Sequence, residues 1–128
     1  MTIEELGGRT FEINDVGVSG YQRLILEMEK IYSKNPDVII VGAGREGTLP
    51  TVVSSLVDCP VIGLPVSSGY GIGGNGITAL LSMLQSCSVL SVVNIDAGFI
   101  AGCNAIKISR KISFARKNVN VTKNCDCL

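Results

Sequence analysis

Residues 37–66 read DVIIVGAGREGTLPTVVSSLVDCPVIGLPV, and this stretch decides the fold. Its opening run of β-branched residues predicts a strand that is buried on both faces. A helix is expected over 48–57, with Thr48 as its N-cap and Pro50 tolerated in the first turn. A second strand is expected over 60–66. The order strand, helix, strand predicts a parallel β-α-β unit.

The same alternation continues on both sides of this stretch. The sequence therefore predicts a three-layer α/β fold, in which a mostly parallel sheet of four strands has helices on both faces. In the helix expected over 76–85, the residues Ile77, Leu80, Leu81 and Leu84 share one face. We expect one domain over 1–113 and a polar, flexible tail over 114–128. The further elements are strands at 9–14 and 91–96 and helices at 21–35 and 98–112.

Length and composition limit the class of protein. The chain has 128 residues, of which 46% are hydrophobic, so it can bury a core as a single domain. No apolar run approaches the length of a membrane span, and the N-terminus lacks the pattern of a signal peptide. Five cysteines, an odd number without framework spacing, favour a reducing compartment. We therefore expect a cytoplasmic protein that does not bind membranes.

Charge is distributed unevenly along the chain. The net charge is zero, yet Asp96 is the one charged residue between Cys59 and Ile106. So long an uncharged stretch exceeds what a small sheet needs to bury, and it indicates contacts between subunits. Six of the eleven basic residues lie from Lys107 onward. Because aromatic residues make up only 5%, we interpret this basic stretch as a solvated helix and expect no nucleic-acid binding.

Glycine-rich segments follow the expected strands. They read NDVGVSG, GAGREG, PVSSGYG and NIDAG, and ligands of open α/β sheets bind beyond these strand ends. Glycine and small polar residues leave backbone N–H groups free, which suits an anionic ligand. The ligand site is therefore expected at this edge of the sheet.

The G-x-G-x-x-G spacing of a dinucleotide-binding turn occurs twice, as GAGREG at 42–47 and as GIGGNG at 71–76. Such a site needs an acidic residue about 20 positions later. The first segment lacks one. The second has Asp96, but it follows the third expected strand instead of the first. Three interpretations stay open: a redox dinucleotide, another phosphate-bearing ligand, or glycines that only form tight turns.

The order of the motifs is similar to the aminoimidazole ribonucleotide carboxylase superfamily. The stretch 37–66 carries this resemblance together with DVGV, GYG, QSC and NIDAGF, from about residue 5 to about residue 112. Within the superfamily, the chain most resembles the C-terminal domain of the LarB family of pyridinium-3,5-biscarboxylic acid mononucleotide synthases, which act in nickel-pincer cofactor assembly. The resemblance implies a flavodoxin-like fold.

Two departures from the family pattern bear on activity. Family members begin this domain with another strand, a Gly/Ser/Thr-rich loop and a helix, which would precede Met1 here, and we expect this loop to help hold substrate phosphate. Purine-pathway members carry a Ser-Ala-His-Arg stretch whose histidine moves a proton. This chain reads SGYQR there, with Gln22 near that place, and has no histidine. The second departure disfavours a purine carboxylase or mutase, whereas the first leaves a non-catalytic binding or assembly role open.

The resemblance implies a carboxylation that uses a cysteine. In the LarB family, a cysteine adds to the pyridinium ring of nicotinic acid adenine dinucleotide, the adduct attacks carbon dioxide, and phosphoanhydride hydrolysis releases AMP. By motif this cysteine is Cys87, whose alternative role is that of a small buried residue at a helix end. Cys87 lies at the sheet edge opposite the expected crevice, so it could serve the crevice of its own chain only through a long loop, or a neighbouring subunit could supply it. Cys59 and Cys103 are expected in the core, and Cys125 and Cys127 in the tail form only half of a metal site.

Glu46 is the general acid/base candidate for the ring proton, because enclosure at the crevice would raise its pKa. Its alternative is a solvated loop carboxylate at a helix N-terminus. Asp15, Arg23 and Arg45 are candidates for holding phosphate or carboxylate groups, and Arg23 alternatively lies on an exposed helix face. Asp96 would need a partner if buried, and could hold a backbone turn, a substrate hydroxyl or a metal.

The remaining expectations concern ligands and assembly. The resemblance implies a pyridine dinucleotide substrate, carbon dioxide or bicarbonate as co-substrate, and no tightly bound cofactor, with Mg²⁺ as an optional ion and no metal-ligating residues assigned. It also implies a homo-oligomer, an octamer in the superfamily. The substrate-binding candidates are Asp15, Gly17, Arg23, Gly42, Gly44, Arg45, Gly47, Ser67, Ser68, Gly69, Tyr70, Gly71 and Asp96.

Overall fold

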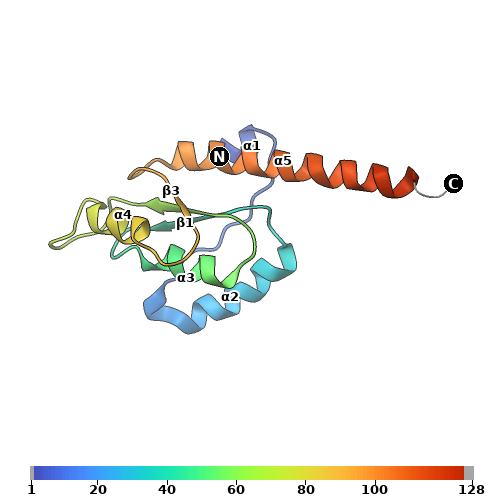
Figure 1. Cartoon of the computed structure of the whole chain (residues 1–128). Coiled ribbons are helices and arrows are strands. Elements are labelled where there is room, and N and C mark those ends of the chain that lie inside the picture. The colour runs from blue at the N-terminus through green and yellow to red at the C-terminus, as the bar shows by residue number, and fades with distance from the viewer. Residues whose placement is uncertain (1, 126–128) are drawn as a thin grey trace.

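The computed structural model describes residues 2–125, and the side chains of 2–119 (Figure 1). Helices and strands alternate along most of the chain, as the sequence predicts. The helices are α1 (Thr2–Glu5), the 3-10 helix η1 (Val18–Gly20), α2 (Tyr21–Lys34), α3 (Thr48–Leu56), α4 (Ile77–Leu84) and α5 (Gly98–Cys125). The strands are β1 (Ile39–Ala43), β2 (Val61–Pro65) and β3 (Ser91–Val92).

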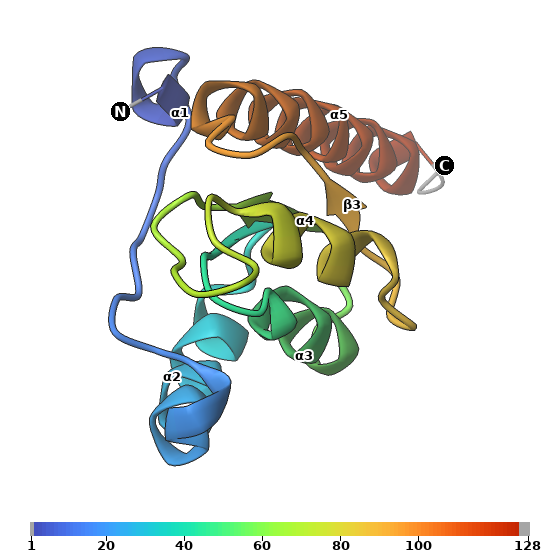
Figure 2. The same ribbon diagram turned by 90° about the vertical axis from the view of Figure 1, so that its left-hand side faces the viewer.

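The three strands form one parallel sheet in the order β1-β2-β3. Ile39 pairs with Val61, and Ile62 pairs with Ser91. Figure 2 shows α1 and α5 on one side of this sheet and α2, α3 and α4 on the other. The predicted α/β, flavodoxin-like class with helices on both faces is therefore confirmed.

Alternation along the strands separates two hydrophobic clusters, one on each face of the sheet. On one face, Val41 and Val61 pack with residues of α2 and α3 such as Leu24 and Val53. On the other face, Ile62 and Val93 pack with Ala101 and Ala105 of α5. Because β2 contributes to both clusters, it is buried on both faces. The β-branched run predicts this burial for β1 instead, but Val41 is the one fully buried residue of β1, so that prediction is not fulfilled for β1 within this chain.

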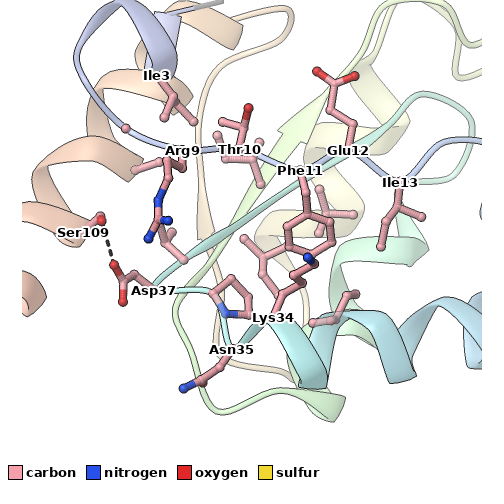
Figure 3. Close-up of a pocket in the computed structure, with 18 of the residues that line it drawn as sticks. Ile3, Arg9, Thr10, Phe11, Glu12, Ile13, Lys34, Asn35, Asp37 and Ser109 are labelled. Carbon is pink, nitrogen blue, oxygen red and sulfur yellow. Dashed lines mark hydrogen bonds between the residues drawn. The ribbon is translucent and has the colours of Figure 1, made fainter.

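The strand expected over 9–14 does not form, and these residues are extended chain without a strand partner. They run from α1 to α2, and a groove separates them from the free edge of β1 (Figure 3). A single extended segment has no ladder to stabilise it. The segment has strand propensity but forms no strand, so the prediction of a strand here is wrong.

Two helix predictions also need correction. Gly47 is the N-cap of α3, and Thr48 is its first residue. On α4 the buried residues are Ala79 and Met83, whereas Ile77, Leu81 and Leu84 are exposed. The apolar face that the sequence singles out thus points away from the core of this chain.

The end of the chain differs from the expectation in two ways. The strand expected over 91–96 has only the two residues of β3. The last helix, α5, continues through the segment expected as a flexible tail, as far as Cys125. Figure 1 shows α5 extending beyond the sheet. Cys127 lies outside the described residues.

Asp37 ties the middle of α5 to the beginning of β1. Its Oδ2 accepts a hydrogen bond of 2.7 Å from the Ser109 hydroxyl, and its Oδ1 lies 2.7 Å from Nη1 of Arg116. The Asp37 side chain is only 18% exposed, so this pair is partly shielded from solvent. The contact fixes α5 across the amino-terminal end of the sheet.

Candidate functional site

The carboxyl ends of the strands place two loops against each other, β1–α3 (44–47) and β2–α4 (66–76). Val66 donates a backbone hydrogen bond of 3.0 Å to the carbonyl of Ala43. A Cβ on Gly69 would lie 2.0 Å from the carbonyl oxygen of Gly44, and a Cβ on Gly44 would lie 2.6 Å from Oγ of Ser68. Glycine is therefore required because the two backbones touch. We refer to the surface where these loops meet, at the carboxyl edge of the sheet, as the candidate crevice.

Gly47 has a structural role at the start of α3. It adopts the left-handed conformation, with φ of 71°, and a Cβ there would lie 2.5 Å from the carbonyl oxygen of Ala79. Gly76 caps α4 in the same conformation, with φ of 80°. Both G-x-G-x-x-G segments thus end on a left-handed cap, which explains the last glycine of each.

Asp96 lies between the end of β3 and α5, at the same edge of the sheet as these loops. It is exposed, so burial, the condition under which it would need a partner, does not apply. Its Oδ1 accepts a hydrogen bond of 2.9 Å from the amide of Ser67, and its own amide donates to the carbonyl of Pro65. Hydrogen bonding by the Ser67 hydroxyl, and then by the Ser67 amide, lowers the pKa of the Asp96 carboxyl. Asp96 therefore holds the β2–α4 loop as an ionised carboxylate.

Arg45 and Tyr70 join the two loops at the rim of the crevice. The guanidinium carbon of Arg45 lies 4.4 Å from the ring centroid of Tyr70, and Arg45 donates a hydrogen bond to the Tyr70 hydroxyl. Both side chains are exposed. The guanidinium has five N–H donors, so it can hold Tyr70 and still bind an anion. Glu46, next to Arg45, is also exposed, and this chain alone does not enclose it.

Asp15 and Arg23 form an ion pair with each other. Asp15 has φ of 57° and lies just before η1, and Arg23 lies in the first turn of α2. The two side chains are 86% and 55% exposed. Gly17 is open, because nothing lies within 4 Å of a Cβ built there. Arg23 thus occupies the exposed helix face that was its alternative placement.

Cys87 lies in the loop between α4 and β3, and it is exposed. This loop precedes β3, so it lies at the amino-terminal edge of a parallel sheet, opposite the crevice. The preceding residue, Ser86, is anchored, because its hydroxyl accepts hydrogen bonds from the hydroxyl of Thr51 and the amide of Ser88. The alternative in which Cys87 is a buried residue is wrong, and one chain does not bring Cys87 to Glu46.

Two other cysteines are expected in the core, and their burial and the possible metal ligands can be compared with the structure. Cys59 and Cys103 are partly buried, and burial raises the pKa of the Cys59 thiol. Among the residues that the structure describes, no three His, Cys, Asp or Glu side chains gather as metal ligands. The residues present therefore do not suggest a dedicated Mg²⁺ site. Within the same described part, no helix is long and apolar enough to cross a membrane.

Sequence reasoning missed a large groove between residues 7–16, the free edge of β1 and α5. Its volume is about 1410 Å³. Figure 3 shows Phe11 and Ile13 on the 7–16 side and Asp37 at the start of β1. The sequence gives no direct signal for this groove, because 9–14 reads as a strand that would belong to the sheet.

Comparison with known proteins identifies the family. The AIR carboxylase family model matches residues 14–124. An uncharacterized protein of Methanocaldococcus jannaschii is 46% identical over 110 residues, which cover 85% of this chain and 42% of that protein. The N5-carboxyaminoimidazole ribonucleotide mutase of Pyrococcus horikoshii is 38% identical over 82 residues, 62% of this chain and 45% of the mutase. The mutase of the same name from Pseudomonas aeruginosa is 28% identical over 110 residues, 85% of this chain and 66% of the mutase.

The chain thus spans less than half the length of the first two relatives. The family match, in contrast, covers most of the chain, and it includes every crevice loop and Cys87. The chain therefore belongs to the AIR carboxylase family.

Proposed function

We propose that this protein carboxylates the pyridinium ring of nicotinic acid adenine dinucleotide, the reaction of the LarB family within the AIR carboxylase superfamily. The absence of histidine from the sequence favours this reaction over that of the purine-pathway mutase. The mutase resemblance requires a histidine that moves a proton, and Gln22, near that place, cannot titrate. Cysteine chemistry has no such requirement, and Cys87 is exposed.

The proposed reaction divides the work between Cys87 and Glu46. The Cys87 thiolate forms a C–S bond to a ring carbon, and the ring electrons then form a neutral enamine. The enamine carbon forms a C–C bond to carbon dioxide. Glu46 removes the proton from that carbon, and the electron pair of the C–H bond returns to the ring. The C–S bond then breaks, its electron pair leaves with the thiolate, and the ring is an aromatic pyridinium again. Water cleaves the phosphoanhydride in a separate step and releases AMP.

Binding of the dinucleotide is assigned to the crevice. The N-termini of α3 and α5 and the glycine-rich loops present backbone N–H groups to phosphate. Arg45 is suited to a carboxylate or phosphate by its fork of donors. Since Cys87 lies at the opposite edge of the sheet, we propose that it serves the crevice of a neighbouring subunit in a homo-oligomer. The exposed apolar face of α4, close to Cys87 in sequence, suits such a contact.

A purine-pathway carboxylase or mutase is the second candidate, because relatives in several organisms carry the mutase name. Product analysis distinguishes the two. The protein is incubated with bicarbonate and either nicotinic acid adenine dinucleotide or N5-carboxyaminoimidazole ribonucleotide, with Cys87→Ala and Cys103→Ala as matched variants. We expect AMP and a biscarboxylated mononucleotide from the wild type and from Cys103→Ala, and neither product from Cys87→Ala.

Turnover of the imidazole ribonucleotide alone would establish the mutase instead. Turnover of neither substrate by folded protein would leave a binding or assembly role.

A further inference from the structure

We propose that Arg45, positioned by Tyr70, binds the carboxylate on the pyridinium ring and thereby discriminates nicotinic acid adenine dinucleotide from nicotinamide adenine dinucleotide. The two dinucleotides differ in one substituent of the ring, which is a carboxylate in the first and a neutral amide in the second. This inference rests on the proposed function, because it concerns the same crevice and the same substrate. It adds the residues that distinguish the acid from the amide.

Arg45 brings a positive charge to the crevice that no acidic side chain neutralises. No ion pair within the described residues involves Arg45. The carboxylate of Asp96, at the same edge of the sheet, accepts instead from the amide of Ser67 at 2.9 Å. The hydrogen-bond partner of Arg45 is the hydroxyl of Tyr70, an uncharged group. The charge of the guanidinium therefore stays available for an anionic ligand.

Tyr70 restricts where that charge lies. The guanidinium carbon of Arg45 is 4.4 Å from the centroid of the Tyr70 ring, and Nη1 of Arg45 donates to the Tyr70 hydroxyl. An arginine that becomes ordered only on binding loses conformational entropy, and a guanidinium already stacked on a ring loses less. One N–H is used by Tyr70, and the other donors of the fork remain for a ligand. Tyr70 is therefore a positioning residue for Arg45.

The surroundings of Arg45 suit an aromatic ring that carries the anion. Tyr70 is 71% exposed, and Ile72, two residues further along the same loop, is fully exposed. This loop thus presents apolar surface next to the arginine in the sequence, and a pyridinium ring can cover such surface whereas a phosphate cannot. The exposed apolar residues therefore favour the ring substituent over the phosphates as the partner of Arg45.

The fork of the guanidinium distinguishes a carboxylate from an amide. A carboxylate has two oxygens and accepts two parallel N–H bonds from an arginine. An amide has one acceptor oxygen, and its NH₂ group would face a second N–H donor of Arg45. The amide therefore gains at most one hydrogen bond, without the charge assistance that strengthens the pair with a carboxylate.

Glu46, the proposed base, directly follows Arg45 in the chain. Cα atoms of consecutive residues are about 3.8 Å apart. In the proposed reaction, the carbon that bears the carboxylate and the carbon that loses its proton are separated by one ring carbon. A ring held through its carboxylate by Arg45 would thus have its reacting carbon within the neighbourhood of Glu46.

The test measures the dissociation constants of both dinucleotides by isothermal titration calorimetry. The full chain carries Cys87→Ala, which excludes the covalent adduct, and bicarbonate is omitted. We expect the acid to bind about tenfold more tightly than the amide. Arg45→Met should weaken binding of the acid alone and bring the ratio of the two constants close to one. Arg45→Lys keeps the charge but not the fork, so its ratio should lie in between.

Two further substitutions separate positioning from a general effect of charge. Tyr70→Leu removes the stack and the hydroxyl, and we expect it to lower the ratio severalfold. Tyr70→Phe keeps the stack and should restore part of the ratio. Lys30→Met is the control, because it also removes one positive charge, from an exposed residue of α2 that pairs with Glu27. It should leave the ratio unchanged.

The outcomes distinguish this inference from the proposed function. A ratio that persists in Arg45→Met, or a ratio near one before any change at Arg45, would overturn the inference and leave the proposed function standing. Equal weakening of both dinucleotides by Arg45→Met would also overturn it, since Arg45 would then contact the phosphates that they share. Binding of neither dinucleotide by folded protein would overturn both the inference and the proposed function.

Discussion

At the scale of single residues, the contact between Gly69 and Gly44 sets the shape of the crevice. An alanine at 69 would place its Cβ 2.0 Å from the Gly44 carbonyl oxygen, and backbone cannot rotate away as a side chain can. We expect Gly69→Ala to lower the free energy of unfolding by about 1–3 kcal/mol, the usual cost of overpacking. Urea denaturation measures this change.

Gly17→Ala is the matched control for that substitution. Nothing lies within 4 Å of its Cβ, and its φ of −170° is extended backbone that any residue adopts. We expect little change in stability. Equal effects at the two positions would contradict the close contact of the loops.

Asp96 provides a prediction about pH. Its pKa is lowered in the folded chain from the ordinary value of 3.8, so its stabilising effect is present above that value. The effect is lost as the pH falls through the lower, folded-state pKa. Asparagine also tolerates the left-handed conformation of this position, where φ is 56°. We expect Asp96→Asn to be less stable than wild type at neutral pH, and the two to converge in strong acid.

The measurement for Asp96 is the urea midpoint of both proteins across this pH range. A difference that stays constant down to strong acid would contradict an ionised carboxylate that holds the amide of Ser67.

Sequence reasoning reaches the residues of the crevice but not all of their roles. Position after a strand predicts that Gly44, Ser67 and Asp96 gather at one edge, and they do. The partnership of Arg45 with Tyr70 depends on how two loops fold toward each other across 25 positions, which local patterns do not encode. The left-handed φ at Gly47 likewise explains the last glycine of its segment, a role that the spacing alone did not distinguish from ligand binding.

At the scale of elements, the exposed face of α4 is a candidate subunit contact. Leu81 is an apolar residue that is 59% exposed, and its helix lies within the uncharged stretch of the sequence. We expect Leu81→Glu to lower the native mass toward that of a monomer, because a charge cannot be buried in an apolar interface without a partner. Light scattering after size exclusion measures the native mass.

Leu26 on α2 is the control, since it is 65% exposed and lies on another helix. Leu26→Glu should leave the native mass unchanged. If both variants keep the wild-type mass, α4 does not form the contact.

The elements also show why part of the fold could not be predicted. The β-α-β unit of β1, α3 and β2 follows directly from periodicity, because its strands pair with each other. Residues 9–14 have strand propensity but depend on a neighbour that the described chain does not supply. On α4, the apolar periodicity marks a helix correctly, yet it does not tell which of two apolar faces meets the sheet.

At the scale of the whole molecule, the opposite positions of Glu46 and Cys87 lead to a complementation test. If each site combines Glu46 of one subunit with Cys87 of another, the variants Glu46→Gln and Cys87→Ala are each inactive. Co-expressed in equal amounts, they should form mixed oligomers in which about a quarter of the sites have both native residues. Product formation at about that fraction of wild type is expected.

Failure of mixed oligomers to recover any activity, although both variants fold and assemble, would place the two residues in the same chain's site. The wild-type reaction would then need Cys87 to reach the crevice within its own subunit.

The proposed reaction passes through a covalent adduct between Cys87 and the pyridinium ring. Intact-protein mass spectrometry with nicotinic acid adenine dinucleotide, with and without bicarbonate, detects such an adduct. We expect a labile mass increase on wild type and on Cys103→Ala, absent from Cys87→Ala. No adduct on folded, oligomeric wild type, or an adduct that persists in Cys87→Ala, would contradict the proposed reaction.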